Sequence, residues 1–122
     1  MVDSSIKADG DYNVQVHGEY ITVMSKALKD YYAEYAGITK LDKISSGLLK
    51  SEIDEMVIKG YYDQWYENAL VQMIFMYNFE LRYFDICNYH WTEVDNVDDL
   101  LNAKRIHNTC LLYTSDAADE AR

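Results

Sequence analysis

The sequence of 122 residues contains no proline and only five glycines, and no two of those glycines form a G-x-G pair. Without proline-rich or glycine-rich tracts, nothing in the sequence marks a linker, and the length suits one small domain. No apolar run approaches the roughly 18 residues that cross a bilayer. The first residues also lack the charged and then apolar pattern of a signal peptide. We therefore expect a cytoplasmic protein that does not bind a membrane.

Positive charge is scarce. The chain has 11 Lys and Arg residues against 21 Asp and Glu residues, which gives a net charge of −10. Because nucleic acids attract basic surfaces, this composition argues against a nucleic acid as partner. Hydrophobic residues are plentiful, at 49% of the chain with 14% aromatic residues. The sequence therefore predicts a folded domain with its own core.

The two cysteines, Cys87 and Cys110, have neither the spacing of metal ligands nor a disulfide framework. Cys87 lies in an apolar run, which predicts a buried thiol in a reducing compartment. Cys110 opens the stretch C-L-L-Y-T-S-D-A-A-D-E, which resembles the translation of a sequencing adapter. We therefore expect residues 1–109 to form the domain and residues 110–122 to be an exposed, non-native tail.

Apolar spacing predicts an α/β fold with helices packed on a mixed β-sheet. Strand formers alternate with polar residues in some segments, and apolar residues recur at helical spacing in others. Gly60 is expected to end the first helix. The predicted order is a hairpin over Tyr12–Ser25, a strand over Tyr32–Leu41, helices over Asp42–Lys59 and Tyr61–Tyr77, strands over Leu81–Cys87 and Trp91–Asp95, and a helix over Val97–Ile106.

The last strand and helix carry most of the candidate chemistry. On a strand, Trp91, Glu93 and Asp95 would share one face. Two carboxylates on one face repel each other unless a positive charge lies beside them. Mg²⁺ suits this place, because it takes oxygen ligands and usually keeps several waters and a substrate phosphate. Spacing alone favours a pair of solvated acids at a strand end.

The stretch W-T-E-V-D-N-V-D-D-L-L-N-A, from Trp91 to Ala103, resembles the C-terminal motif of nucleotidyltransferases. These enzymes make CDP-choline, CDP-phosphonates or nucleoside-diphosphate sugars. The resemblance implies that Glu93 and Asp95 bind the Mg²⁺ that bridges the nucleotide phosphates. It also implies transfer of a nucleotidyl group from a nucleoside triphosphate, with CTP favoured, to a phosphorylated small molecule such as phosphocholine, releasing pyrophosphate.

Two further stretches resemble the acceptor-binding part of the same family. Glu34 lies in Y-A-E-Y-A-G-I-T-K-L, and Trp65, Tyr66 and Glu67 begin W-Y-E-N-A-L. The resemblance implies that these four side chains bind the acceptor substrate. Aromatic rings attract a desolvated cation such as a quaternary ammonium. From the residues alone, Glu34 is equally well an acid on an edge strand. The stripe of apolar and aromatic residues from Tyr66 to Tyr77 is of a kind that is usually part of the core.

The family's glycine-rich phosphate loop and its second metal-binding acid have no counterpart here. We therefore expect the C-terminal portion of a partial Rossmann-like domain, which lacks the nucleotide-binding half and is inactive alone. Such a portion would leave a sheet edge open. A sugar 1-phosphate or a phosphonate is the alternative acceptor. The alternative of another class is a non-enzymatic α/β interaction module with an exposed apolar patch on the helix over residues 61–77. The sequence leaves the nucleobase and the oligomeric state open.

Overall fold

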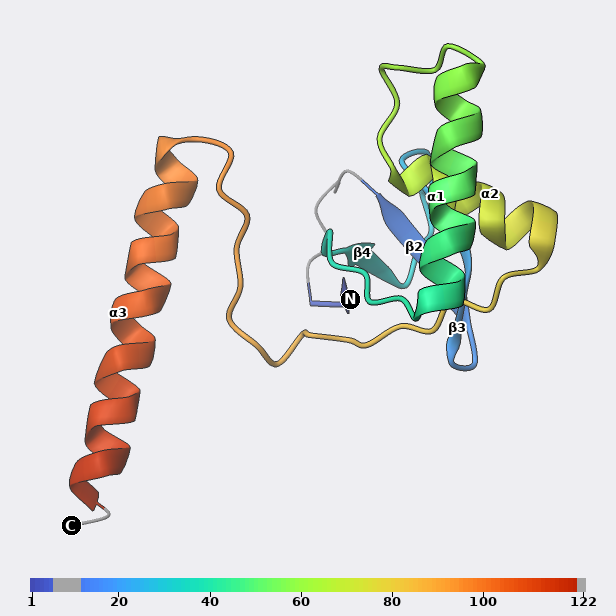
Figure 1. Cartoon of the computed structure of the whole chain (residues 1–122). Helices are drawn as coiled ribbons and strands as arrows, with labels where there is room; N and C mark the ends of the chain where they lie inside the picture. The colour runs from blue at the N-terminus through green and yellow to red at the C-terminus, as the bar shows by residue number, and fades with distance from the viewer. Residues whose placement is uncertain (6–11, 121–122) are drawn as a thin grey trace. The chain divides into compact units, whose positions relative to one another are not determined.

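The computed structural model describes residues 1–5 and 12–120, with side chains as far as residue 112, in two units (Figure 1). Met1–Cys87 contains the sheet and two helices, and Asn88–Arg122 contains one helix. The elements are β1 (Val2–Asp3), β2 (Asn13–His17), β3 (Tyr20–Ser25), β4 (Ala33–Tyr35), α1 (Lys43–Ile58), α2 (Glu67–Tyr77) and α3 (Val97–Glu120).

The sheet has the strand order β1-β4-β2-β3, and its three strand pairs are antiparallel. The predicted α/β class is confirmed in this coarse form. A mixed sheet was expected, and among the described residues the parallel pairing is limited to an isolated bridge between Val2 and Asp85. The predicted hairpin is confirmed, with His17 opposite Tyr20. Its two-residue turn begins at Gly18, whose φ of +59° suits glycine.

The predicted strand over Tyr32–Leu41 is mostly wrong, because β4 is only Ala33–Tyr35. Gly37 has a φ of +73°, which is incompatible with an extended strand. The chain therefore leaves the sheet directly after Tyr35.

The predicted strand over Leu81–Cys87 is also wrong, because it forms isolated bridges and no continuous ladder. The segment still bonds to both edge strands. Val2 donates its N–H to the carbonyl of Phe84 at 2.9 Å and accepts from Ile86 at 2.8 Å, while Ile21 donates to Leu81 at 2.8 Å. The open sheet edge expected of an incomplete domain is thus covered at these points.

The helix predicted over Asp42–Lys59 is confirmed within one residue at each end. The Asp42 side chain accepts from the Ser45 N–H at 2.7 Å and caps the helix. This hydrogen bond lowers the pKa of Asp42. Gly60, with a φ of +83°, follows the last turn in the left-handed conformation that glycine adopts most easily.

The second helix starts later than predicted, at Glu67 instead of Tyr61, and ends at Tyr77 as predicted. Its buried side chains Ala69, Leu70 and Met73 lie on one helical stripe. Helix α2 packs against β3, and α1 packs against α2. The buried cluster around the sheet consists of Val2, Tyr12, Val14, Ile21, Met24, Ala33, Tyr35 and Leu81.

The strand predicted over Trp91–Asp95 is wrong, because the described residues of this segment pair with no other strand. The helix after it is confirmed and is longer than expected, since α3 continues to Glu120. It crosses the boundary predicted after residue 109 without a break. Cys110, Leu111 and Leu112 are exposed, as expected for that stretch. Cys87 is half-buried, less than expected.

Candidate functional site

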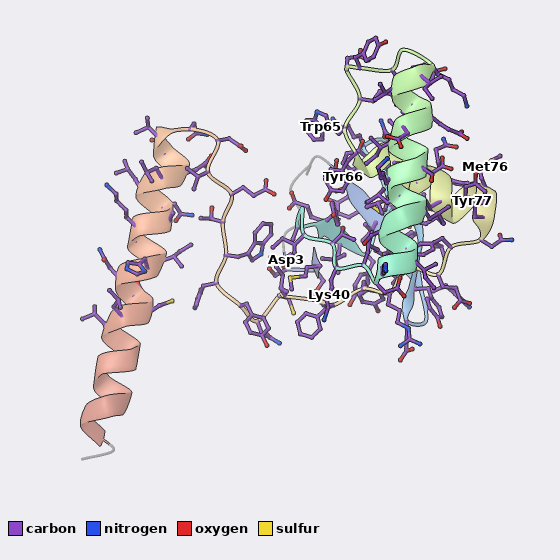
Figure 2. All side chains as sticks on the ribbon, in the orientation of Figure 1. Asp3, Lys40, Trp65, Tyr66, Met76 and Tyr77 are labelled. Carbon is purple, nitrogen blue, oxygen red and sulfur yellow. The ribbon has the colours of Figure 1, made fainter. Side chains whose placement is uncertain are left out.

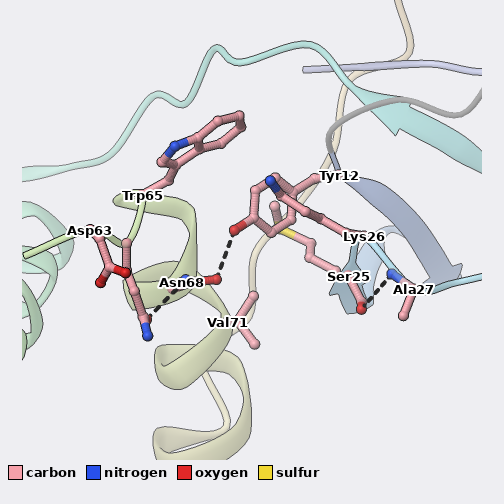
Figure 3. A pocket seen from close by; sticks show the side chains of 10 residues that line it. Tyr12, Ser25, Lys26, Ala27, Asp63, Trp65, Asn68 and Val71 are labelled. Carbon is pink, nitrogen blue, oxygen red and sulfur yellow. Dashed lines mark hydrogen bonds between the residues drawn. The ribbon is translucent and has the colours of Figure 1, made fainter. Parts of the chain in front are cut away.

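A hollow of about 420 Å³ opens in the first unit beside the start of α2. Three parts of the chain surround it: Tyr12 with the end of β3, the turn before α2, and the first turns of α2 itself (Figure 3). These parts are brought together by the packing of α2 against β3. The lining residues are Tyr12, Met24, Ser25, Lys26, Ala27, Asp63, Gln64, Trp65, Asn68 and Val71.

Two aromatic rings and a lysine form the centre of this hollow. The ring centroids of Tyr12 and Trp65 are 6.1 Å apart, with the rings inclined at 50°. The ammonium of Lys26 lies 3.9 Å from the Trp65 centroid and 5.5 Å from the Tyr12 centroid. Both distances fall within the range in which an aromatic face attracts a cation. The hollow therefore holds a positive charge on aromatic rings.

A hydrogen bond ties the ring of Tyr12 to α2. The Tyr12 hydroxyl donates to Oδ1 of Asn68 at 2.7 Å, and Nδ2 of Asn68 donates to Oε1 of Gln64 at 3.0 Å. The ring of Tyr12 is buried, whereas Trp65 is 46% exposed. One wall of the hollow is therefore fixed in place, and the indole that faces it is accessible from solvent.

Tyr66 and Glu67 lie next to Trp65 in the chain but belong to a different cluster, around Tyr35. The Tyr66 hydroxyl hydrogen-bonds to the Tyr35 hydroxyl at 2.8 Å, and Tyr35 also bonds to Thr39. Burial, followed by the Tyr66 hydrogen bond and the nearby Glu67 charge, raises the pKa of Tyr35, although the Thr39 bond acts against it. Glu67 is buried in the first turn of α2, where a carboxylate complements the helix dipole.

Glu34 lies on the other face of the sheet. In β4 the side chains alternate, so that Ala33 and Tyr35 face the core and Glu34 points the opposite way. Its partners across the sheet are Asp3 and Asn13, which share its face. Of the four residues predicted to bind the acceptor, only Trp65 lines the hollow. The substrate-binding roles of Glu34, Tyr66 and Glu67 stay predictions.

Glu93 and Asp95 belong to the second unit, on an irregular segment before α3, and both are exposed. The Asp95 N–H donates to Oδ2 of Asp99 at 3.1 Å, and the Asp99 N–H donates to Oδ1 of Asn96 at 3.0 Å. These two bonds resemble a capping box, except that the Asp99 side chain accepts from Asp95 and not from the cap residue Asn96, and they fix the start of the helix.

The donor chemistry of this segment fits Mg²⁺, which is often held by one or two carboxylates together with phosphates and waters. The shared strand face that was predicted for Glu93 and Asp95 is absent, because Trp91–Asp95 is not a strand. Among the described residues, no three His, Cys, Asp or Glu side chains are grouped closely enough to hold a metal. The magnesium role of the pair stays a prediction.

Tyr12, Lys26 and Asn68 were not predicted to line this hollow. Lys26 is exposed, yet its ammonium lies over the Trp65 ring. These residues are far apart in the chain and share no motif. Their meeting depends on how α2 packs on the sheet, for which the sequence carries no local signal.

No family model, curated protein or solved structure matches this chain. Along the described residues, no helix has the length and apolar character that a membrane span needs.

Proposed function

We propose that this chain is the C-terminal portion of a cytoplasmic, Mg²⁺-dependent nucleotidyltransferase with a Rossmann-like domain. The enzyme would transfer a nucleotidyl group from a nucleoside triphosphate, with CTP favoured, to a phosphorylated small molecule such as phosphocholine. One observation carries the acceptor side of this proposal. Trp65, in the stretch that resembles the family's acceptor site, already faces a cation at 3.9 Å in an open hollow.

In the proposed reaction, an acceptor phosphate oxygen attacks the α-phosphorus of the triphosphate. The new P–O bond forms as the bond to the β-phosphate breaks, and pyrophosphate leaves with the electron pair. Such transfers depend mainly on positioning and on charge stabilisation. In this chain, Trp65 and Tyr12 would hold the acceptor's cation.

Tyr66 would support the turn that carries Trp65 through its bond to Tyr35. Glu93 and Asp95 would hold Mg²⁺, which supplies positive charge beside the nucleotide phosphates. A sugar 1-phosphate or a phosphonate is the alternative acceptor.

The metal side of the proposal is tested by Asp95→Asn in an enzyme restored to full length. This change keeps the shape but removes the charge that a hard cation needs. Loss of the charge stabilisation that a metal provides in the transition state should lower turnover at least roughly a hundredfold. Asp98→Asn, in the first turn of α3, is the matched control and should change turnover little. Near-normal turnover of Asp95→Asn at ordinary Mg²⁺ concentration would remove the metal role.

The acceptor side is tested by Trp65→Ala in the same enzyme. The measurement is the ratio of kcat/KM for phosphocholine to kcat/KM for a sugar 1-phosphate. Loss of the aromatic face should lower this ratio by roughly two- to thirtyfold, because only phosphocholine carries a cation. Tyr62→Ala, on an exposed ring outside the hollow, is the control. An unchanged ratio in Trp65→Ala would argue against a cationic acceptor.

A second candidate function is a non-enzymatic interaction module, favoured by the exposed apolar end of α2. Phe75, Met76 and Tyr77 are 64%, 69% and 53% exposed. Figure 2 shows Met76 and Tyr77 at this end of the helix, away from Trp65 and Tyr66 at the other. Three large apolar side chains exposed within one helical turn favour a contact surface at this end of α2.

The coding sequence upstream of Met1 distinguishes the two candidates. A nucleotidyltransferase should have a glycine-rich phosphate loop within about 120 residues upstream of Met1, a stretch comparable in length to a small domain. An upstream sequence without such a loop would favour the interaction module.

A further inference from the structure

The cation on Trp65 belongs to the protein itself, and this has a consequence for any ligand that carries a cation. Lys26 directly follows β3, and its ammonium lies over the Trp65 ring, 3.9 Å from the ring centroid (Figure 3). A quaternary ammonium that used this ring face would have to take the place of the lysine. The residue that marks the hollow as a cation site is therefore also a competitor for it.

Within the described part of the chain, Lys26 forms no ion pair, although Asp63 lines the same hollow. Its ammonium is held by the two aromatic rings and by solvent. The lysine is exposed, and its flexible four-carbon stem lets the charge move over several ångströms at little steric cost. An ammonium displaced from Trp65 thus remains at the edge of the hollow, available to an anion there.

We propose that Lys26 makes the hollow select ligands that carry both a cation and a phosphate. The ligand's ammonium displaces Lys26 from Trp65, and the displaced ammonium pairs with the ligand's phosphate. A ligand that has only the cation must displace Lys26 without offering it a new partner. This inference rests on the proposed function and adds to it the residue that separates phosphorylated from free acceptors.

The proposal predicts opposite effects of one substitution on two ligands. Lys26→Met keeps the length and apolar stem but removes the charge. It should improve the affinity for choline by roughly two- to fivefold, because the aromatic face is vacant. It should weaken the affinity for phosphocholine by roughly threefold or more on balance, because the loss of a charge-assisted bond to phosphate outweighs the gain at the vacant aromatic face.

The sequence has two tryptophans. The experiment therefore uses the full chain with Trp91→Phe, which leaves Trp65 as the single tryptophan. Choline and phosphocholine are titrated separately, and quenching of Trp65 fluorescence gives each affinity. Lys29→Met, an exposed lysine outside the hollow, is the matched control and should change neither affinity. Lys26→Arg should retain the preference for phosphocholine.

The outcomes separate this inference from the proposed function. The proposed displacement of Lys26 by the ligand's ammonium is overturned if Lys26→Met changes neither affinity, or if neither ligand quenches the fluorescence of Trp65. In either case, turnover of the restored enzyme with phosphocholine can still support the proposed function. If the opposite shifts appear but the restored enzyme transfers no nucleotidyl group to phosphocholine, the exchange stands and the proposed function fails.

Discussion

Different interactions hold the two units of this chain in their conformations. Every described side chain that is buried lies in Met1–Cys87, and from residue 88 to residue 112 none is buried. In the first unit, contacts between segments that are far apart in the chain hold the backbone in its conformation, such as the packing of α2 against β3. In the second unit α3 depends on signals within a few residues, namely the Asn96 cap and the acidic residues Asp98 and Asp99 in its first turn. Substitutions of the same kind should therefore have different effects in the two units.

The largest difference is expected for leucine truncation. Leu70 is fully buried in α2, and Leu70→Ala should lower the free energy of unfolding by about 2–5 kcal/mol, through lost burial and the cavity left behind. Leu101→Ala, in α3 where the side chain is 56% exposed, should change it by less than roughly 0.5 kcal/mol. Urea unfolding followed by tyrosine and tryptophan fluorescence measures both. Equal losses for the two variants would contradict the comparison.

A smaller effect is expected at the start of α3. Asn96→Ala removes the side-chain oxygen that accepts from Asp99 N–H at 3.0 Å, and should cost the helix about 0.5–2 kcal/mol. Far-ultraviolet circular dichroism over a temperature series should show earlier loss of helix, while the fluorescence transition of the first unit stays in place. Asn102→Ala, in the middle of α3, is the control and should preserve the helix. A melt of Asn96→Ala identical to wild type would show that the cap contributes nothing.

A third effect, confined to acid, is expected at Asp85. Burial alone would raise the pKa of this carboxyl, but hydrogen bonds from Ser4, Cys87 N–H and Tyr32 together hold its pKa below the ordinary value. The stability it contributes is therefore complete above about pH 4, the unfolded value, and is lost as the pH falls through the lower folded pKa. In wild type, the urea concentration at the unfolding midpoint of the first unit should fall below pH 4. Asp85→Asn should make this fall smaller.

The hydrogen bond to Asp85 also raises the pKa of Tyr32 to about 12, so Tyr32→Phe offers an intermediate variant. It removes one of the donors to Asp85 and keeps the others. Its acid profile should lie between those of wild type and Asp85→Asn. A wild-type profile in Asp85→Asn would show that this carboxyl does not couple folding to pH.

The smallest effect is expected in the stretch from residue 110 onward. Leu111 and Leu112 are 52% and 68% exposed in α3. Their double replacement by serine should leave the unfolding of the first unit unchanged within roughly 0.5 kcal/mol. A clear loss of stability would show that this stretch contributes to the fold, against its resemblance to translated adapter sequence.

Local signals in the sequence predicted the helices better than the strands. Asp42 and Gly60 set the ends of α1 within one residue of prediction, because a cap and a left-handed glycine act within one turn. The start of α2 was predicted six residues early. Apolar spacing there does not show where the helix begins. Trp65 and Tyr66 lie before the helix, where they contact Tyr12 and Tyr35.

The missing strands have one physical cause. Alternation over Leu81–Cys87 and Trp91–Asp95 shows that these residues suit a strand, but a strand exists only where a neighbour supplies hydrogen bonds. Leu81–Cys87 forms only isolated bridges to β1 and β3, and Trp91–Asp95 pairs with none of the described strands. Which segments lie beside them cannot be read from the neighbouring sequence. The same reason explains the site: Trp65 was found through its motif, whereas Lys26 and Tyr12 reach it only through the packing of the sheet on α2.

The bonds from Val2 to Phe84 and Ile86 also constrain when the first unit can fold. A ribosome releases the N-terminus first, so β1 emerges long before the residues that complete its hydrogen bonds. Closing so long a loop carries an entropic cost that a local hairpin avoids, and such distant contacts slow folding. The β2–β3 hairpin can form early during synthesis, and β1 can pair with β4 once Tyr35 has been made. The bonds of Val2 to Phe84 and Ile86 have to wait until nearly all of Met1–Cys87 has been made.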